Sequence, residues 1–212
     1  HVWGTGINAY YQDLQVKQLP KNVTYYSVRG PRSIRYLNDK GVNLAAPVGQ
    51  GEFPYGDPGI LVPFLFPQYQ LGSNQSQTAK KKRCFVPHYH DQDRLVPGAR
   101  IIDVSQSLNE VFEQLVSECY SVASTSLHGL ISADAVGLPS MWFQWNDSLT
   151  STTEGSFKYL DYLESIGSSI KTPERDLASA ENFNKYTTPL SMKRRREIAY
   201  RTQVSFPYHL FE

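Results

Sequence analysis

The second half of the chain alternates short apolar, β-branched runs with stretches in which apolar residues recur at helical spacing. The apolar runs predict buried strands, and the spaced stretches predict amphipathic helices between them. This order is typical of α/β proteins, and right-handed crossovers would wind it into a parallel sheet. The predicted elements are strands at Cys84 and Ile101, a helix at Leu108, a strand at Tyr120, a helix at Leu130 and a strand at Met141.

The stretch from Cys119 to Phe143 carries the clearest indication of a functional site. It predicts a strand, a break at Ser124-Thr125-Ser126, and a helix that ends at Gly137. The loop between such a strand and the start of the next helix offers free backbone N–H groups and the positive end of the helix dipole. Together with the hydroxyls and the imidazole of His128, this loop suits an anionic ligand.

The rest of the pattern adds elements on both sides of that stretch. Ser107 and Glu110 stand at the spacing of a capping box, which predicts where the helix at Leu108 begins. Pro31 suits the first position of a helix, and Gly41 suits its end. Further predictions are strands over Val2–Ile7, Val23–Val28 and Arg100–Val104, and helices over Pro31–Gly41, Phe157–Gly167 and Pro189–Tyr200.

The composition changes between Pro67 and Lys82, where Gln, Ser, Gly and Asn lead into the basic cluster from Lys80 to Arg83. This change predicts a linker or a long surface loop. We therefore expect a partial N-terminal half over residues 1–80, a C-terminal half over 81–186, and a C-terminal helix and tail over 187–212. Because the chain enters a predicted strand almost at once, we also expect the first half to be short of its earliest strands.

Charge and hydropathy narrow the classes of partner. A formal net charge of +1 gives no field that would attract nucleic acid, so we expect no nucleic-acid partner. The longest apolar run, from Ile60 to Pro67, is short and is broken by Pro63, so we expect no transmembrane segment. The chain is rich in aromatic residues, with 14 Tyr, 10 Phe and 3 Trp. Aromatic rings can stack on sugars, although they are more often part of a core.

The chain has two cysteines, Cys84 and Cys119, and both stand in apolar runs. Two cysteines make no disulfide framework, so we expect buried thiols. Free thiols favour a reducing compartment.

Further polar residues stand beside predicted strands and turns. Arg29 lies at a strand-to-helix turn, where its guanidinium can bind a phosphate or carboxylate or can pair with a nearby acid. The segment from His88 to Asp93 contains two His and two Asp, but alternate residues at a strand end point to opposite faces. We therefore expect the rim of an active site there rather than a metal. Asp57 is expected in a turn or at a helix N-cap, and Lys158 with Asp161 as a surface ion pair.

Several segments together resemble the polysaccharide pyruvyltransferase family. They are VWGTGI, YYSVRGPRS, YGDPG, VPHYHD, STSLHGLISADAVGLP and FKYLDYLESIG, in this order along nearly the whole chain. Each segment alone is a common strand-and-glycine pattern, whereas their order makes the resemblance specific.

The resemblance implies two Rossmann-like halves that face a cleft, similar to one class of glycosyltransferases, with the first half incomplete here. It implies transfer of pyruvate from phosphoenolpyruvate onto a saccharide as a ketal, with no cofactor, and a saccharide or lipid-linked saccharide as acceptor. The implied catalytic residue is His128. The implied donor-binding residues are Arg29, Ser126, Leu127, Gly129 and Lys158, and the implied rim of the cleft is His88, His90 and Asp57. We expect a cytoplasmic protein, or one of the Golgi lumen if the organism is eukaryotic.

This chain departs from the family pattern at one position. Many members have arginine directly before Leu-His-Gly, where this chain has Ser126. A charged contact to the donor must then come from Lys158, Arg32 or the basic cluster from Lys80 to Arg83. Two alternatives remain open: a glycosyltransferase that uses a nucleotide sugar, and a noncatalytic carbohydrate-binding or assembly protein. Without the resemblance, His128 is most simply a histidine at a helix start that bonds to the backbone.

Overall fold

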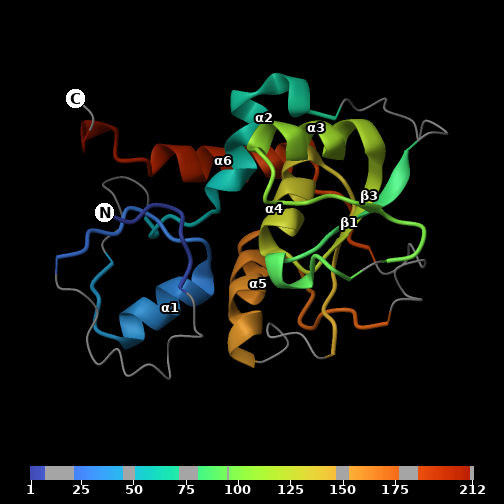
Figure 1. Cartoon of the computed structure of the whole chain (residues 1–212). Helices are drawn as coiled ribbons and strands as arrows, with labels where there is room; N and C mark the ends of the chain where they lie inside the picture. The colour runs from blue at the N-terminus through green and yellow to red at the C-terminus, as the bar shows by residue number, and fades with distance from the viewer. Residues whose placement is uncertain are drawn as a thin grey trace. The chain divides into compact units, whose positions relative to one another are not determined.

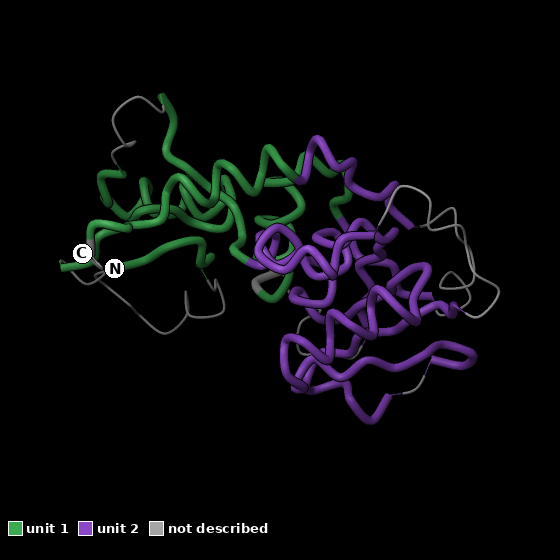
Figure 2. Tube along the Cα trace, turned by 90° about the horizontal axis from the view of Figure 1, so that it is seen from above, with its two compact units in different colours: residues 1–58, 149–171, 196–212 green, residues 59–148, 172–195 purple. Residues whose placement is uncertain are grey.

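The computed structural model describes residues 1–7, 22–44, 51–71, 81–94, 96–146, 153–176 and 186–210 (Figure 1). The chain forms two compact units (Figure 2). Unit 1 comprises residues 1–58, 149–171 and 196–212, and unit 2 comprises residues 59–148 and 172–195. Each unit thus draws on several stretches of the chain. None of the helices in the described ranges combines the length and the apolar character that a membrane crossing needs.

Unit 2 is built around a parallel sheet of four strands in the order β2-β1-β3-β4. This arrangement confirms the predicted α/β class and parallel pairing. β2 is shorter than the predicted strand because Asp103 accepts hydrogen bonds from the backbone and the hydroxyl of Ser105, which turns the chain away from the sheet. The strands are β1 (Lys82–Val86), β2 (Arg100–Ile101), β3 (Cys119–Ser124) and β4 (Ser140–Trp142).

The two faces of this sheet are covered differently. Side chains alternate along a strand, so Phe85, Ala123 and Met141, which are aligned in the register, share one face. They form an apolar cluster with Val96 and Phe143. On the other face lie the helices α3 (Leu108–Glu118) and α4 (Leu127–Val136), which pack on β3 and on each other.

The ends of α3 and α4 follow the predicted signals. The capping box of Ser107 and Glu110 is present at the start of α3, since each side chain bonds the other's backbone N–H. Gly137 ends α4 in the left-handed conformation with φ of +89°. The guanidinium of Arg195 donates to the Ala135 carbonyl at 2.9 Å and so satisfies an acceptor at this helix end. The basic run from Lys193 to Arg196 is therefore not all solvated, because Arg195 is buried.

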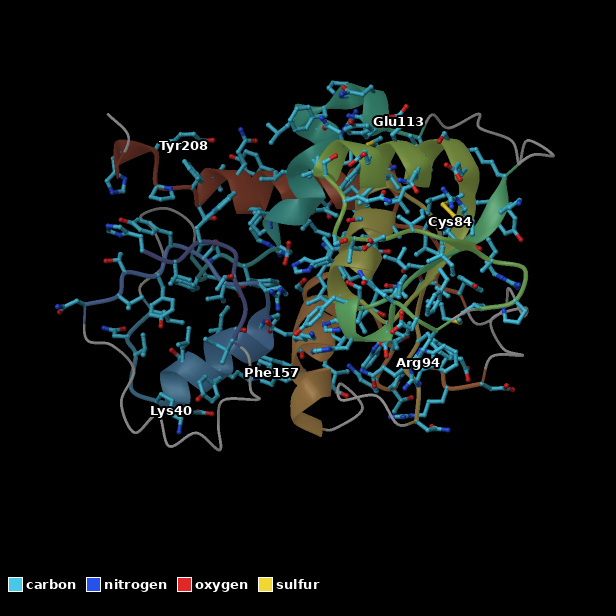
Figure 3. The ribbon with its side chains drawn as sticks, viewed as in Figure 1. Lys40, Cys84, Arg94, Glu113, Phe157 and Tyr208 are labelled. Atoms are coloured by element: carbon cyan, nitrogen blue, oxygen red, sulfur yellow. A yellow bond between two sulfur atoms is a disulfide. The ribbon has the colours of Figure 1, made fainter. Side chains whose placement is uncertain are left out.

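The expectation of two free thiols is wrong, because Cys84 and Cys119 form a disulfide with a Cα–Cα distance of 5.6 Å (Figure 3). The bond joins β1 to the start of β3, and both cysteines are fully buried. Sequence spacing cannot reveal this contact, because the pairing of two strands brings together residues 35 positions apart. The argument for a reducing compartment loses its basis, since a structural disulfide is typical of an oxidising one.

Unit 1 contains short parallel pairings and two helices that pack together. Isolated bridges join Val2 to Tyr25, Thr5 to Val28 and Val28 to Tyr55, so the predicted strands at 2–7 and 23–28 pair in parallel but remain short. The core behind them contains Val28, Leu37 and Phe53. The helices are α1 (Pro31–Asp39) and α5 (Thr153–Ser165), and α5 begins earlier than the predicted Phe157.

The last helix, α6 (Met192–Val204), contributes its first residues to unit 2 and the rest to unit 1. It begins later than the predicted Pro189 because the hydroxyl of Ser191 accepts from the backbone N–H of Arg194 and caps the helix there. The predicted linker from Pro67 to Lys82 lies largely outside the described residues. The short helices are η2 (Pro58–Leu61), α2 (Val62–Leu65), η3 (Pro67–Tyr69), η4 (Tyr89–Asp91) and η8 (Tyr208–Leu210).

Candidate functional site

In unit 2 the connections that leave β1 and β3 diverge at the carboxyl ends of these neighbouring strands. The chain passes from β1 to β2 on one side, and from β3 through α4 to β4 on the other. Such a divergence is a topological switch point, and ligands of open α/β sheets bind outside the carboxyl ends of the strands at this place. We call the residues that follow the two strands, 87–91 and 124–129, the switch-point site.

Hydrogen bonds fix the two loops of the switch-point site to each other. The hydroxyl of Ser124 donates to the Val86 carbonyl at 2.7 Å and accepts from the backbone N–H of Ser126 at 2.9 Å. The hydroxyl of Thr125 accepts from the backbone N–H of His88 at 2.8 Å. Ser124 and Thr125 are fully buried, so their hydroxyls hold the loops in place.

Gly129 allows α4 to begin very close to the sheet. A Cβ atom at this position would lie 2.7 Å from Cγ1 of Val86 and would also overlap the Ser124 hydroxyl. Ser126 is the N-cap of α4, and its hydroxyl accepts from the backbone N–H of Gly129 at 3.4 Å. The positive end of α4 is therefore held directly beyond β1 and β3, with a neutral hydroxyl as its cap.

The residues predicted around His128 differ in the solvent exposure of their side chains. Leu127 and Gly129 are buried, Ser126 is buried as the cap, and His128 is the exposed side chain in this first turn. Ser126, Leu127 and Gly129 thus shape the turn, whereas the His128 imidazole can reach a ligand. No charged side chain replaces the arginine of the family pattern within residues 124–129.

The loop after β1 presents a cluster of three rings. Tyr89 lies between two histidines, with ring centroids 4.3 Å from His88 and 3.9 Å from His90. His90 and Tyr89 are exposed, and Tyr89 has 62% of its surface accessible to solvent. The predicted rim residues His88 and His90 therefore lie in the switch-point site, together with a tyrosine that the sequence did not single out. Among the described residues, no three His, Cys, Asp or Glu side chains are grouped as a metal site.

In unit 1 the strand-to-helix turn before α1 holds Arg29. Its Nε atom donates to Oδ2 of Asp57 at 2.9 Å, and the side chains are 12% and 10% exposed. Gly6 leaves room for this guanidinium, because a Cβ there would lie 2.6 Å from an Nη atom. Within the described residues the Nη groups of Arg29 have no hydrogen-bond partner. Arg29 thus pairs with a nearby acid, which is one of the two predicted alternatives. It also retains hydrogen-bond donors that an anion could accept from. Asp57, which directly precedes η2, is the partner of Arg29.

Asp161 occupies the position at which an anion would bind the start of α1. Its carboxylate accepts from the backbone N–H of Ser33 at 2.9 Å and from the Ser33 hydroxyl at 2.6 Å. Burial raises the pKa of Asp161, although these hydrogen bonds and the charge of Arg29 act in the opposite direction. Gly30 is needed for this approach, because a Cβ there would overlap the backbone of Asp161. The predicted surface ion pair with Lys158 is therefore wrong for Asp161, which is fully buried.

Lys158 stands on α5, close enough to Arg29 for their charges to interact. Burial lowers the pKa of Lys158, and the positive charge of Arg29 lowers it further. Among the described residues Lys158 makes no hydrogen bond or ion pair, and its ammonium lies 5.3 Å from the ring centroid of Tyr159. We call Arg29, Asp57, Lys158 and Asp161 the Arg29 cluster. Two neighbouring cations with donors to spare are suited to a phosphate or a carboxylate.

The predicted site residues thus form two groups. One is the switch-point site of unit 2, and the other is the Arg29 cluster of unit 1. Sequence reasoning missed the roles of Tyr89 and Asp161. Asp161 stands one helical turn after Phe157, which was expected to face inward, and this spacing could have indicated a buried carboxylate. The predicted residues are distributed as follows: His128, Ser126, Leu127, Gly129, His88 and His90 in unit 2, and Arg29, Asp57 and Lys158 in unit 1.

The chain is similar to a viral protein. The chain is 29% identical, over 182 residues, to an uncharacterized protein of Acanthamoeba polyphaga mimivirus. The match covers 78% of this chain and 54% of the viral protein, so the chain spans about half the length of this relative. No family model matches the chain. No solved structure matches it.

Proposed function

We propose that the chain is part of a pyruvyltransferase that moves pyruvate from phosphoenolpyruvate onto a saccharide as a ketal. The observation that carries the proposal is the exposed imidazole of His128 in the first turn of α4, at the topological switch point of a parallel sheet. An imidazole at this place can exchange protons with a ligand near neutral pH, beside a helix end that favours anions. The motifs that resemble the family also coincide with the glycines that shape both strand-to-helix turns.

In the proposed reaction His128 donates a proton to the methylene carbon of the donor, which becomes a methyl group. The adjacent carbon becomes electrophilic, a hydroxyl of the acceptor sugar attacks it, and the proton of that hydroxyl returns to the His128 imidazole. A second hydroxyl of the same sugar then displaces phosphate and closes the ketal ring, and its proton leaves with the phosphate as hydrogen phosphate. The products are the ketal and inorganic phosphate, and the helix end stabilises negative charge that develops during the reaction.

The donor carries a phosphate and a carboxylate, and the Arg29 cluster is suited to such anions. Arg29 keeps its Nη donors, and Lys158 supplies a second cation that has no ion-pair partner within the described residues. These cations are the charged donors that unit 1 offers to the phosphate or the carboxylate.

The proposal includes the finer architecture that the resemblance implies, namely two Rossmann-like halves of the GT-B-like type. Unit 2 has a parallel sheet of four strands, and unit 1 has three short parallel pairings and the helix α1. We further propose that the protein works in an oxidising compartment such as the Golgi lumen, because the buried Cys84–Cys119 disulfide favours one. The acceptor is a saccharide or a lipid-linked saccharide.

The test is phosphate release from phosphoenolpyruvate in the presence of methyl pyranosides that offer two neighbouring free hydroxyls. His128→Ala should lower the rate by about 10²- to 10⁴-fold, the usual contribution of a general acid. Its far-UV circular dichroism should be unchanged, because the side chain is exposed. His209→Ala, a second exposed histidine that belongs to neither site, is the matched control and should retain the activity.

Equal turnover in both variants would overturn the role of His128. Release of a nucleoside diphosphate from a nucleotide sugar, without phosphate release from phosphoenolpyruvate, would replace the proposal by glycosyl transfer. Failure of both reactions, with saccharide binding retained, would leave the noncatalytic carbohydrate-binding protein.

A further inference from the structure

The loop after β1 exposes the ring of Tyr89, which takes no part in the proposed proton transfer at His128. Tyr89 exposes 62% of its surface although its ring lies close to those of His88 and His90. A ring that neighbouring rings hold in place, with much of its surface in solvent, loses little freedom when a flat apolar partner stacks on it. The apolar face of a pyranose ring is such a partner.

The position of this ring is fixed relative to the catalytic turn of the same unit. The backbone N–H of His88 donates to the hydroxyl of Thr125, and Thr125 stands three residues before His128. β1 and β3, which carry the two loops, are paired from Lys82 to Val86. A sugar that stacks on Tyr89 therefore binds at the switch-point site itself.

A second observation points to a ligand with hydroxyl donors. Asp91, the last residue of η4, is 3% exposed, and its Oδ2 atom has no hydrogen-bond partner among the described residues. Its Oδ1 atom lies 3.6 Å from Nε of Arg94, which is long for a hydrogen bond. A buried carboxylate oxygen without a donor is unfavourable, and a hydroxyl from a ligand would satisfy it. A pyranose offers several such hydroxyl donors.

We infer that Tyr89, with the histidines beside it and Asp91, forms the acceptor subsite and binds a neutral pyranose by stacking. The inference rests on the proposed function for the use of the sugar, whereas the binding itself can be measured without turnover. The Nδ1 atom of His88 accepts from the backbone N–H of His90 at 3.4 Å, and the exposed imidazole of His90 adds a polar group for the sugar hydroxyls. Tyr89 is thus a specificity-determining residue that is not itself part of the proton transfer.

The test is saturation-transfer-difference NMR with methyl glucoside, methyl galactoside and methyl mannoside, which differ in the orientation of single hydroxyls. Tyr89→Ala should weaken binding of the preferred glycoside roughly tenfold or more, since it removes the stacking surface. Tyr89→Phe should retain most of the affinity, because the ring face remains. Tyr200→Ala removes another exposed tyrosine, at 69% exposure on α6, and should leave the affinity unchanged.

The outcomes separate this inference from the proposed function. Loss of glycoside binding in Tyr89→Ala but not in Tyr200→Ala supports the subsite, even if the protein releases no phosphate from phosphoenolpyruvate. Equal glycoside affinity in Tyr89→Ala and the unaltered protein overturns it, even if His128→Ala abolishes phosphate release. Preferential competition by uridine diphosphate also overturns it, because the ring would then stack on a base.

Discussion

The two units contain strand-to-helix turns that are built in the same way and completed differently. In each turn a glycine allows close packing, Gly30 before α1 and Gly129 in the first turn of α4. At α1 the free N–H groups are satisfied by Asp161, a carboxylate of the chain itself. At α4 the cap is the neutral hydroxyl of Ser126.

This difference indicates what each turn can bind. The start of α1 is already capped by the carboxyl group of Asp161, so an external anion in unit 1 must be bound by the side chains of Arg29 and Lys158. The start of α4 keeps its positive end without a carboxylate cap, and it carries the exposed His128. Turns of one construction are therefore completed by a carboxyl group of the chain in one unit and by a neutral hydroxyl in the other.

The largest expected effect concerns the disulfide, which joins β1 to the start of β3 in unit 2 and has no counterpart in unit 1. Replacing both cysteines by alanine should lower the free energy of unfolding of unit 2 by about 4 kcal/mol, the chain-entropy value for a loop of this length. Hydrogen exchange should become faster at the amides of Val122 and Phe143, whereas those of Tyr26 and Gly56 should keep their protection. Equal loss of protection in both units would show that the stabilisation by the disulfide is not confined to unit 2.

The next effect concerns the paired glycines. Gly30→Ala and Gly129→Ala should each destabilise the protein by about 1 to 3 kcal/mol in urea unfolding, because the added methyl group has no room. Gly30→Ala should cost more, since its methyl group meets the backbone of α5, whereas at Gly129 the better helix propensity of alanine offsets part of the strain. Ser132→Ala, on the same helix as Gly129, is the control and should change stability by less than about 0.5 kcal/mol. If Gly129→Ala leaves the free energy of unfolding unchanged, the close packing of α4 against the sheet is contradicted.

A third prediction uses the carboxylate that caps α1. Because burial raises the pKa of Asp161 above its unfolded value, the folded state binds the proton more tightly than the unfolded state does. The stability contributed by this group should be complete below the unfolded pKa, near 3.8, and should be lost as the pH rises through the folded pKa. Relative to Asp161→Asn, the protein should therefore become less stable as the pH rises through this window. If the protein instead becomes more stable relative to Asp161→Asn as the pH rises, the hydrogen bonds from Ser33 affect the pKa of Asp161 more than burial does.

The smallest expected effect concerns the cations of unit 1. Since Arg29 contributes to the lowered pKa of Lys158, Arg29→Gln should move that pKa back toward the ordinary value. Inorganic phosphate should raise the same pKa in the unaltered protein, because a bound anion favours the charged amine. Both shifts can be followed by carbon NMR of the lysine Cε. Arg175→Gln, which changes an exposed arginine of unit 2, serves as the control. If phosphate leaves the pKa of Lys158 unchanged, the Arg29 cluster does not bind the anion.

The fold of unit 2 was predictable because its signals are local. The capping box of Ser107, the stop at Gly137 and the alternation of strands and helices each depend on residues that are neighbours in the sequence. The bounds were less predictable, since β2 ends where Asp103 bonds Ser105 and α6 begins where Ser191 caps it. Such choices between nearby polar residues depend on tertiary contacts.

The candidate site was predictable in part. His128 could be placed at a helix start from the pattern alone, and the structure confirms that position. The partners of Arg29 and Asp161 could not be placed, because each contact joins residues that are far apart in the chain. The disulfide was missed for the same reason. The domain bounds and the catalytic roles remain predictions.

The Cys84–Cys119 bond closes a covalent ring that contains η4, β2 and α3. A protease that cuts the backbone once within this ring leaves two fragments that stay joined. The loop with Tyr89 and the turn with His128 would thus remain covalently attached after such a nick, and reduction would separate them where the cut lies between Tyr89 and Cys119.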